Sequence, residues 1–589
     1  MSRIAALAAT LVLAAAVASA QQIQIQVPPP PPPPPPGMAA GMPPARDNST
    51  KPGTSVIKGR IVAADSGQPL RKVFIRVSAP ELREGRVTTT DADGRYEIRE
   101  LPAGRYTLNA SKGSFVSLQY GQLRPFEPGK PLEILDAQTL EKVDFALPRG
   151  SVITGRVVDE FGEPVADAQV APMRYVNQGG RRRLQPAGRQ TTTNDIGEYR
   201  LFGLPPGQYY VSATLRPGAM IGGAAGAVII QGGQASDDRS GYAPTYYPGT
   251  PNVAEAQKLT LGLAQTVNEI NVPLTPTRMA SISGTAYDPQ GQPMSFGMVM
   301  VIQRQGEGGF SMSSGNMIRP DGSFTVSGLA PGNYTLQAMN PNMNGGVVDL
   351  GAMATADVTI AGEDVKDVRL ASQTPSVVTG RIVFGDAGAA ASLKASLFRV
   401  VATFRNPEDF SPFMGGPGKV NDDFTFEMKL RPGAGQLIRV TSMTPSGWAL
   451  KSVKVRGLDV TDTGIEVKPN EELTGVEVEM TNRVTDLSGL VTNARGEAVR
   501  DYTLVVFPQD REQWGPGSRF VRTGRPDQDG RYKITGLPAA SYYAVAVDYI
   551  DPGDATDPEF LDRVKSKAAT LTLRDGDTKV LDLKVTPAS

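Results

Sequence analysis

Two acidic stretches have the residue types and the spacing at which calcium loops begin. They are Asp91-Ala92-Asp93-Gly94 and Asp527-Gln528-Asp529-Gly530. An EF-hand loop also needs a third oxygen ligand and a glutamate at position twelve, which neither stretch supplies. The corresponding stretches Asp195-Ile196-Gly197 and Asp321-Gly322 keep the turn but lose the first acid. A tight turn explains all four stretches, so we expect no metal site; the weak calcium candidates are Asp91, Asp93, Asp527 and Asp529.

Histidine and cysteine do not occur among the 589 residues. Without histidine there can be no Ser-His-Asp triad, no His-ligated zinc and no imidazole base near neutral pH. Without cysteine there can be no disulfide, thiolate metal site or thiol nucleophile. A glycoside hydrolase would need two carboxylates about 5–10 Å apart in a cleft, and no such pair stands out. A carboxylate-based hydrolase is therefore a distant alternative, and we expect no enzyme activity and no cofactor.

Flat aromatic rings beside polar groups are the side chains that would bind sugars, and this chain has few. Its residues are 6% aromatic, with two tryptophans. The segment "GYAPTYYPGT" follows a glycine-rich insertion at 218–234 and gathers Tyr242, Tyr246 and Tyr247. We take these three and Trp514 as candidate ligand-binding residues. The alternative is that the tyrosines tie a long loop to its own domain.

The first 20 residues have the features of a secretory signal peptide. Arg3 precedes an apolar run from Ile4 to Val17, and Ala18-Ser19-Ala20 is an A-x-A cleavage site. The mature chain would begin at Gln21, and no later stretch reaches about 18 apolar residues. We expect an exported protein that is periplasmic, cell-surface or extracellular, with no transmembrane segment in the mature chain.

Residues 21–53 have the composition of a linker. Pro28 to Pro36 are nine consecutive prolines, which predict a polyproline II rod. Gly37 to Gly53 continue as a flexible segment. We expect a stalk; the alternative is a ligand for a proline-binding partner. Lys+Arg and Asp+Glu balance at 60 each, so no global field would attract nucleic acid.

An opening phrase occurs five times after the linker: "SVIKGRIVAADSGQP", "SVITGRVVDEFGEP", "SISGTAYDPQGQP", "SVVTGRIVFGDAG" and "DLSGLVTNARGEA". In each copy a glycine interrupts an apolar run, which marks a bulge or the close approach of another backbone. The copies are roughly 100–130 residues apart, the size of small β-domains rather than of solenoid units. The five glycines are Gly59, Gly155, Gly284, Gly380 and Gly489.

A second phrase is "TDADGRYEIRELPAGRYTL" (Thr90 to Leu108), followed in each repeat by a short alternating segment such as "KVDFAL". Asp93-Gly94 predicts a tight turn, after which Tyr96 and Ile98 point to one face. A second turn leads to Tyr106, which resembles the tyrosine corner of Greek-key sandwiches. The fourth copy, "VNDDFTFEMKLRPGAGQLIRV", lacks this tyrosine, whereas the other copies have Tyr209, Tyr334 and Tyr542.

These phrases are similar to the carboxypeptidase regulatory-like domain, a transthyretin-like β-sandwich of the carbohydrate-binding-like fold group. The resemblance covers about residues 54 to 589. It implies an all-β fold of five tandem Greek-key β-sandwich (prealbumin- or Ig-like) domains. In metallocarboxypeptidases this domain resembles an appendage beside the catalytic domain, so the resemblance implies no catalytic residues. The fold group also implies sugar binding as an option.

The predicted organisation is a signal peptide (1–20), a linker (21–53) and five β-sandwiches, called repeats 1 to 5 below. Their ranges are 54–149, 150–277 (with a long loop insertion), 278–372, 373–482 (divergent) and 483–589. In repeat 5, Asp557 to Ala568 predict a short helix. We predict a non-catalytic exported protein for envelope scaffolding, adhesion or ligand binding, with a polysaccharide or a cell-envelope protein as partner. The alternative is a carbohydrate-binding protein that uses exposed Tyr and Trp side chains.

Overall fold

The structure is a computed structural model that describes most of the chain beyond the linker. The described ranges are 53–82, 85–178, 181–215, 240–305, 309–313, 317–339, 343–344, 347–348, 353–405, 418–441, 447–515 and 517–588. The predicted signal peptide, nearly all of the linker and the glycine-rich insertion lie outside them. Residues 52–589 form one compact unit. Within the described ranges, no helix has the length and apolar character needed to span a bilayer.

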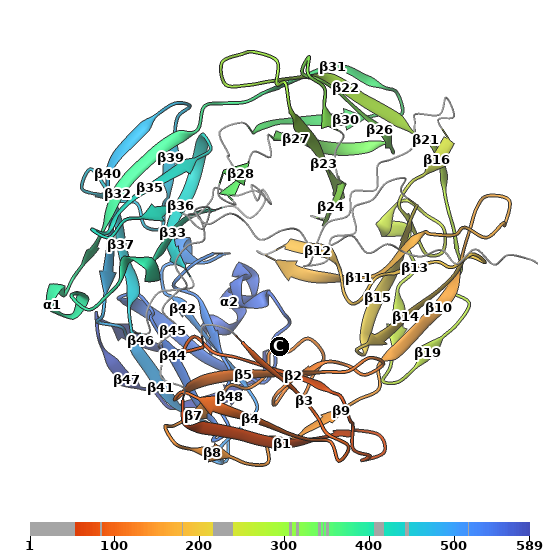
Figure 1. The fold of residues 1–589 in the computed structure, drawn as a ribbon. Coiled ribbons are helices and arrows are strands. Elements are labelled where there is room, and N and C mark those ends of the chain that lie inside the picture. The colour runs from red at the N-terminus through yellow and green to blue at the C-terminus, as the bar shows by residue number, and fades with distance from the viewer. Residues whose placement is uncertain are drawn as a thin grey trace, which may run out of the picture. The chain divides into compact units, whose positions relative to one another are not determined.

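The same strand pairings recur in every repeat (Figure 1). In repeat 1 the opening strand β1 (Ser55–Ala63) is antiparallel to β4 (Arg95–Leu101) and parallel to β9 (Phe145–Leu147). In the second sheet, β5 (Gly104–Ser111) is antiparallel to β2 (Phe74–Ser78). This confirms the predicted all-β fold of β-sandwich type.

The remaining strands of repeats 1 and 2 extend these two kinds of sheet, except for two strands of repeat 2 that form a separate two-stranded sheet. Repeat 1 adds β3 (Arg86–Thr89), β6 (Leu118–Gln119), β7 (Leu132–Ile134) and β8 (Thr139–Leu140). Repeat 2 has β10 (Ser151–Val158), β14 (Glu198–Leu204), β19 (Thr266–Val267) and β20 (Val272–Pro273) in its first sheet. Its other strands are β11 (Gln169–Gln178), β12 (Arg181–Pro186), β13 (Thr191–Thr192), β15 (Gly207–Thr214), β16 (Ser240–Tyr242), β17 (Thr245–Tyr246), β18 (Leu259–Leu261) and β21 (Pro276–Arg278). Of these, β16 and β21 pair with each other in the separate sheet.

Repeats 3 and 4 follow the same plan. The first sheet of repeat 3 has β22 (Ala280–Tyr287), β26 (Ser323–Leu329) and β31 (Val365–Ala371). Its second sheet has β23 (Gly297–Gln305), β24 (Gly309–Ser313), β25 (Met317–Ile318), β27 (Gly332–Met339) and β30 (Ala354–Ile360). A separate hairpin consists of β28 (Met343–Asn344) and β29 (Val347–Val348). Repeat 4 has β32 (Ser376–Phe384), β34 (Lys419–Val420), β35 (Thr425–Leu430), β37 (Ala449–Val455), β38 (Leu458–Asp459) and β40 (Glu472–Thr481), facing β33 (Arg399–Phe404), β36 (Gly433–Thr441) and β39 (Ile465–Val467). A short helix, α1 (Ala387–Ala390), follows its opening strand.

In repeat 5 the strands join into one eight-stranded sheet. The junction is β48 (Leu583–Thr586), which pairs in parallel with both β41 (Asp486–Thr492) and β45 (Ala540–Val547). The remaining strands are β42 (Thr503–Pro508), β43 (Arg522–Gly524), β44 (Arg531–Thr535), β46 (Ala569–Leu573) and β47 (Thr578–Val580).

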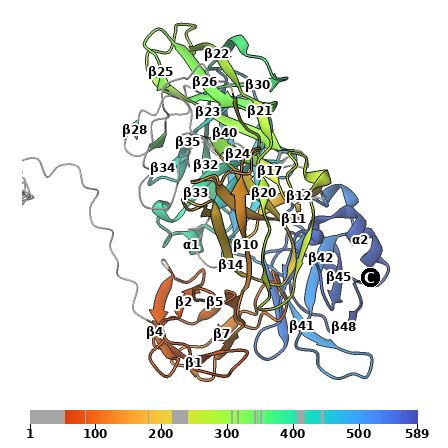
Figure 2. The same ribbon diagram turned by 90° about the vertical axis from the view of Figure 1, so that its right-hand side faces the viewer.

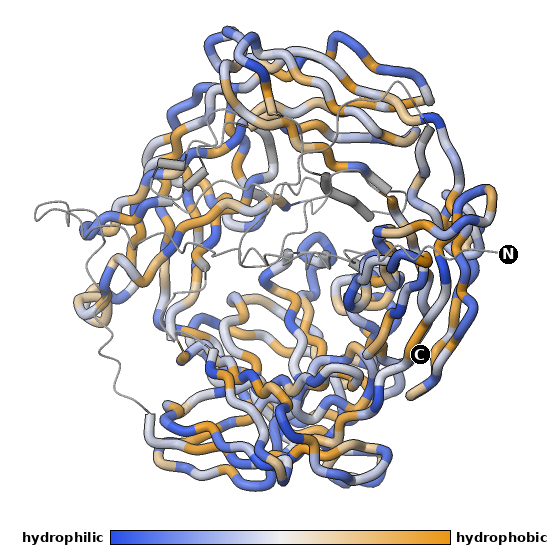
Figure 3. The backbone as a smooth tube through the Cα atoms, turned by 45° about the vertical axis from the view of Figure 1, so that its right-hand side comes forward, coloured by the Kyte–Doolittle hydropathy of each residue, from blue (hydrophilic) through white to orange (hydrophobic). Residues whose placement is uncertain are grey.

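The core lies between the sheets of each repeat and follows from the alternation of apolar and polar residues along the strands (Figure 3). In repeat 1, Ile57 and Ile61 of β1 pack with Val77 of β2 and Leu108 of β5, all fully buried. In each of the five largest clusters, the buried residues come from a single repeat. The number and the boundaries of the domains nevertheless stay a prediction.

The opening glycine allows the close backbone approach that its place in a strand predicts. A Cβ at Gly59 would lie 1.9 Å from the carbonyl oxygen of Val143, and one at Gly155 would lie 2.0 Å from that of Ile270. The Tyr96 hydroxyl donates a hydrogen bond of 2.6 Å to the same Val143 oxygen. The glycine therefore brings the opening strand against the segment before the closing strand.

The predicted tyrosine corner is confirmed in four repeats. The Tyr106 hydroxyl donates to the carbonyl oxygen of Pro102 at 2.6 Å, four residues back in the preceding turn. In repeat 4, where the tyrosine is missing, the buried Gln436 donates from Nε2 to the carbonyl oxygen of Arg431 at 2.6 Å. An amide thus replaces the phenol there. The other three corners join Tyr209 to Pro205 (2.8 Å), Tyr334 to Ala330 (2.5 Å) and Tyr542 to Pro538 (2.7 Å).

The buried tyrosines predict a loss of stability at alkaline pH. Burial raises the pKa of Tyr106 to about 12 and also raises the pKa of Tyr209 and Tyr542, against about 10 in an unfolded chain. Above pH ~10 the unfolded chain binds fewer protons than the folded one, so stability falls as pH rises. We expect little change between about pH 6 and 9, where no histidine titrates, and a falling Tm beyond pH ~10. Thermal melts across pH, with tyrosinate absorbance, measure this; loss of stability below pH 9 would contradict it.

The predicted helix of repeat 5 is present and covers one face of the sheet. It is α2 (Pro558–Lys565), slightly shorter than predicted, and the Asp557 carboxylate accepts a hydrogen bond of 3.0 Å from the Glu559 amide at its start. Phe560 and Val564 are buried in one cluster with residues of β42 and β45, beside which Figure 2 shows the helix. This confirms a short helix packed over the last sheet.

Candidate functional site

The three tyrosines proposed as a ligand site pack onto repeat 2. Tyr246 is only 5% exposed and lies in a small apolar cluster with Met173. Tyr242 and Tyr247 are half-buried against the main core of the repeat. The Tyr242 hydroxyl donates to the Glu160 carboxylate at 2.6 Å, and this hydrogen bond raises the pKa of Tyr242 to about 12. This packing agrees with the alternative that the tyrosines tie down a loop, and ligand binding by them stays a prediction.

Trp514, the fourth candidate, packs in repeat 5. Its indole Nε1 donates to the carbonyl oxygen of Pro508 at 2.7 Å. Its ring meets that of Phe507 edge-on, with 5.4 Å between the ring centroids. Trp514 and the tyrosines belong to different apolar clusters, so the structure does not bring the four candidates together as one aromatic surface.

The acidic turns use their carboxylates to close the backbone. One carboxylate oxygen of Asp91, Oδ1, accepts hydrogen bonds from the backbone amides of Asp93 (2.9 Å) and Arg95 (2.7 Å). Asp527 accepts in the same way from Asp529 and Arg531, both at 2.9 Å. Across the described ranges, no three His, Cys, Asp or Glu residues are grouped so as to hold a metal ion. The turn geometry explains these acids, and the expectation that no metal binds at Asp91, Asp93, Asp527 and Asp529 stays untested.

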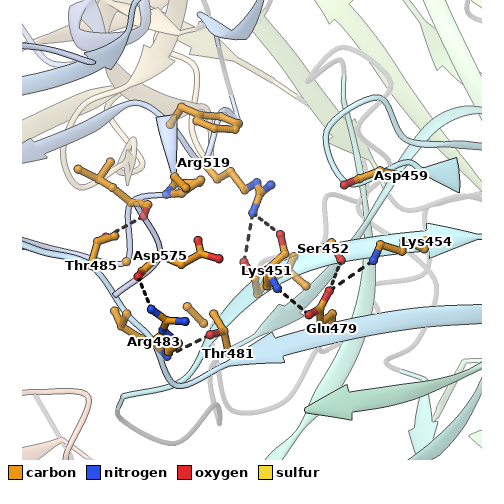
Figure 4. A pocket seen from close by; sticks show the side chains of 18 residues that line it. Lys451, Ser452, Lys454, Asp459, Glu479, Thr481, Arg483, Thr485, Arg519 and Asp575 are labelled. Atoms are coloured by element: carbon orange, nitrogen blue, oxygen red, sulfur yellow. Dashed lines mark hydrogen bonds and ion pairs between the residues drawn. The ribbon is translucent and has the colours of Figure 1, made fainter. Parts of the chain in front are cut away.

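A cavity of about 290 Å³, lined by both polar and apolar side chains, lies where repeat 4 meets repeat 5 (Figure 4). Strands β37 and β40 supply one wall, which includes Lys451 and Glu479. The segment that connects the repeats supplies Arg483, and repeat 5 supplies Arg519 and Asp575. The sequence carries no signal for this cavity, because its charged residues come from separate strands and loops of two repeats and each looks like an ordinary surface residue.

The charges on the repeat 4 wall neutralise one another. Glu479 lies 2.8 Å from the Lys451 ammonium, and Ser452 donates to it at 2.9 Å. Burial opposes the charged form of Glu479, but the hydrogen bonds from Lys451 and Ser452 outweigh it, so its pKa is lowered. The same hydrogen bond raises the pKa of Lys451. At neutral pH, Glu479 is therefore ionised and Lys451 is protonated.

These protonation states do not suit catalysis. Serine activated by lysine needs a neutral lysine as base, whereas Lys451 is held in its charged form. A glycosidase needs a carboxyl group with a raised pKa as general acid, whereas the pKa values of Glu479 and Asp459 are both lowered. The arrangement can bind and position groups.

Arg519 connects the two repeats across the cavity. Its Nε donates to the two carboxylate oxygens of Asp462 at 2.9 and 3.0 Å, and its Nη1 donates to the backbone carbonyls of Leu450 (3.1 Å) and Lys451 (3.0 Å). Asp462 also lies 3.6 Å from Arg439. A side chain of repeat 5 thus holds both a carboxylate and the backbone of repeat 4.

The model of the carboxypeptidase regulatory-like domain matches residues 56–147 and 152–219. The matched stretches cover nearly all of repeat 1 and the first half of repeat 2, which confirms the resemblance. The matched family is a regulatory-like, non-catalytic domain.

Other comparisons cover smaller shares or are more distant. The TonB-dependent transporter Oar of Myxococcus xanthus is 39% identical over 62 residues, which are 10% of this chain and 6% of that protein. A streptococcal ancillary pilin is similar at 15% identity and a TM-score of 0.20, covering 54% of this chain and 99% of the pilin. The minor pilin GBS52 of Streptococcus agalactiae has 11% identity and a TM-score of 0.21, covering 38% of this chain and 97% of the pilin. Such low identities and TM-scores say nothing about function.

Proposed function

We propose that this chain, whose first two repeats are carboxypeptidase regulatory-like domains, is an exported, non-catalytic scaffold protein of the cell envelope or cell surface. The observation that carries this proposal is the Arg519 joint. Its guanidinium holds the backbone and a carboxylate of the neighbouring repeat. Within the cavity, charged side chains serve to connect repeats or neutralise one another, and such joints would make the tandem stiff.

Binding to envelope material tests the proposal. The mature protein would be incubated with cell-envelope fractions and purified polysaccharides, with and without a chelator. We expect retention on an envelope component, either a polysaccharide or a protein, with no breakdown of that component and no effect of the chelator. Turnover of any polysaccharide or peptide in the fractions would contradict the proposal, and so would an absence of retention.

Arg519→Ala should loosen the joint between repeats 4 and 5. The change removes the side-chain donor of two backbone carbonyls and leaves Asp462 with Arg439 alone, 3.6 Å away. Losses of this kind cost about 1–3 kcal/mol. We expect faster amide exchange around residues 450–462 while the strands of repeat 1 are unaffected. The control is Arg511→Ala, which breaks an exposed ion pair with Asp562 at 2.9 Å and should change little. Equal exchange in the two variants would show that Arg519 does not hold the joint.

Carbohydrate binding is the second candidate function, and the cavity is the observation that favours it. Its volume suits a small saccharide unit, and its wall offers donors and acceptors beside the ring of Phe520. A saccharide that binds there should protect Lys451 from acylation and should bind more weakly to Asp575→Ala. Unchanged affinity in Asp575→Ala would exclude the cavity as the binding site.

A further inference from the structure

Repeat 1 and repeat 5 contact each other through a buried ion pair. Arg525 of repeat 5 places Nη1 2.6 Å from Glu127 of repeat 1, and Nη2 2.6 Å from Asp501 of its own repeat. The side chains of Glu127 and Arg525 are 1% and 4% exposed. A buried charge needs a partner, because its transfer out of water is otherwise unfavourable. The close fit of these two residues therefore depends on contact between the first and last repeats.

Basic side chains of repeat 1 surround this pair and donate to the backbone of repeat 5. Lys130 donates to the carbonyl oxygen of Arg500 at 2.5 Å. Arg105 donates to that of Lys533 at 2.7 Å. The acceptors are main-chain carbonyl oxygens, so these hydrogen bonds depend on the backbone conformation of repeat 5 and not only on a negative charge.

A glutamine side chain adds a contact that fixes the orientation of the two repeats. The Gln528 amide donates from Nε2 to the carbonyl oxygen of Glu133 and accepts from the Glu133 amide, both at 3.1 Å. This two-point pairing imitates a backbone bridge, and it forms only when both groups are aligned. The contact is therefore specific.

No buried apolar cluster of the described residues spans this contact. The buried members of the core cluster of repeat 1 lie between residues 57 and 147, and those of repeat 5 lie between 487 and 583, with no cluster in common among the described residues. The Arg124 guanidinium lies 5.1 Å from the centroid of the Tyr549 ring and adds a cation–π contact. Interfaces between domains that lack a shared apolar core resemble those of separable complexes.

We propose that this interface is a latch: a docking surface on repeat 1, made by Arg105 and residues 124–133, whose occupant is repeat 5 of the same chain, and which opens and closes without unfolding either repeat. Burial of the Glu127–Arg525 pair makes the closed state specific, and the lack of a shared apolar core makes it reversible. The latch gives the tandem a closed and an open state, a property that the scaffold function does not require.

The occupant is the chain's own repeat 5 because the intervening repeats keep it near. A tether turns docking into an intramolecular event with a high effective concentration, whereas a second copy must supply its surface from solution. Exchange of repeat 5 between copies would use the same residues, and its detection is one outcome of the test.

Distance measurements between two spin labels test the latch. The chain has no cysteine, so Leu135→Cys and Arg531→Cys introduce labels only at these exposed positions beside the Glu133–Gln528 contact. We expect a short, narrow distance in the labelled parent. Glu127→Gln should raise the population of long distances on the order of tenfold. The matched control, Glu198→Gln, removes a charge from an exposed ion pair inside repeat 2 and should leave the distances unchanged.

Three results would overturn the proposal. The first is a long or broad distance in the labelled parent, and the second is an unchanged distance in Glu127→Gln. The third is loss of the short distance when labelled chains are diluted with unlabelled ones, which would assign the contact to two copies. If Glu127→Gln does not give a folded protein by circular dichroism, Gln528→Ala replaces it, since it removes only the amide contact. Unchanged distances in Gln528→Ala would then overturn the proposal.

Discussion

Gly59→Ala is expected to disrupt repeat 1, whereas Gly113→Ala is expected to leave it intact. The new Cβ at position 59 would lie 1.9 Å from the carbonyl oxygen of Val143 and 2.6 Å from its carbon. Gly59 lies within β1, and the Val143 amide donates to the carbonyl oxygen of Lys58 at 3.0 Å, so the backbone itself must move. Overpacking of a rigid site costs about 3 kcal/mol or more when it cannot relax. At Gly113, no heavy atom lies within 4 Å of the added Cβ.

Local measurements are needed, because a chain with several cores is not expected to unfold in one step. Hydrogen exchange followed by peptide mass spectrometry would compare β1 and β9 in the two variants. We expect rapid exchange throughout repeat 1 in Gly59→Ala, with repeats 3 to 5 protected as in the parent. Parent-like exchange of β1 in Gly59→Ala would show that the strand pair tolerates the side chain, and the same loss in Gly113→Ala would point to an unspecific effect of alanine.

The features that could be predicted from the sequence depend on residues close together in the chain. The turn at Asp93-Gly94, the core-facing Tyr96 and the corner at Tyr106 lie within fifteen residues, and all repeats but the fourth have the same pattern. The turn is constant across these repeats whereas the acids vary, so the sequence favours a turn over a metal site. The glycine in the opening strand also predicts a close backbone contact, but the sequence does not show that the neighbour is Val143.

The features that could not be predicted depend on partners far apart in the chain. Glu127 and Arg525 are separated by 398 positions, and each alone looks like a solvated surface charge. Periodicity locates apolar faces, but it carries no information about which polar residues meet between repeats. Gln436 illustrates a second limit, since its amide takes the place of the corner phenol without sharing the tyrosine pattern.

A polar contact between repeats, which periodicity does not reveal, is also the target of the second substitution with a large expected effect. Arg525→Met should destabilise the contact between repeats 1 and 5 by up to about 3–5 kcal/mol. It removes the nearest cation from the buried Glu127 carboxylate, which keeps only the more exposed Arg124 guanidinium, 3.5 Å away. The loss is limited by the strength of the latch, since beyond that point the repeats separate and water solvates the carboxylate. Arg525 also donates to Thr503 at 3.3 Å and pairs with Asp501, so part of the effect falls within repeat 5.

A double-mutant cycle separates the two parts. Glu127→Leu added to Arg525→Met removes the stranded charge and replaces the pair with apolar groups, a change that is often close to neutral in buried sites. We expect the double variant to recover most of the protection from exchange around residues 121–133 that Arg525→Met loses. The comparison pair, Arg156→Met with and without Glu198→Leu, concerns an exposed ion pair and should show coupling below about 1 kcal/mol. If the two substitutions reduce this protection in a strictly additive way, the pair does not hold the repeats together. Two charges that are buried against each other should instead show a coupling energy in the double-mutant cycle.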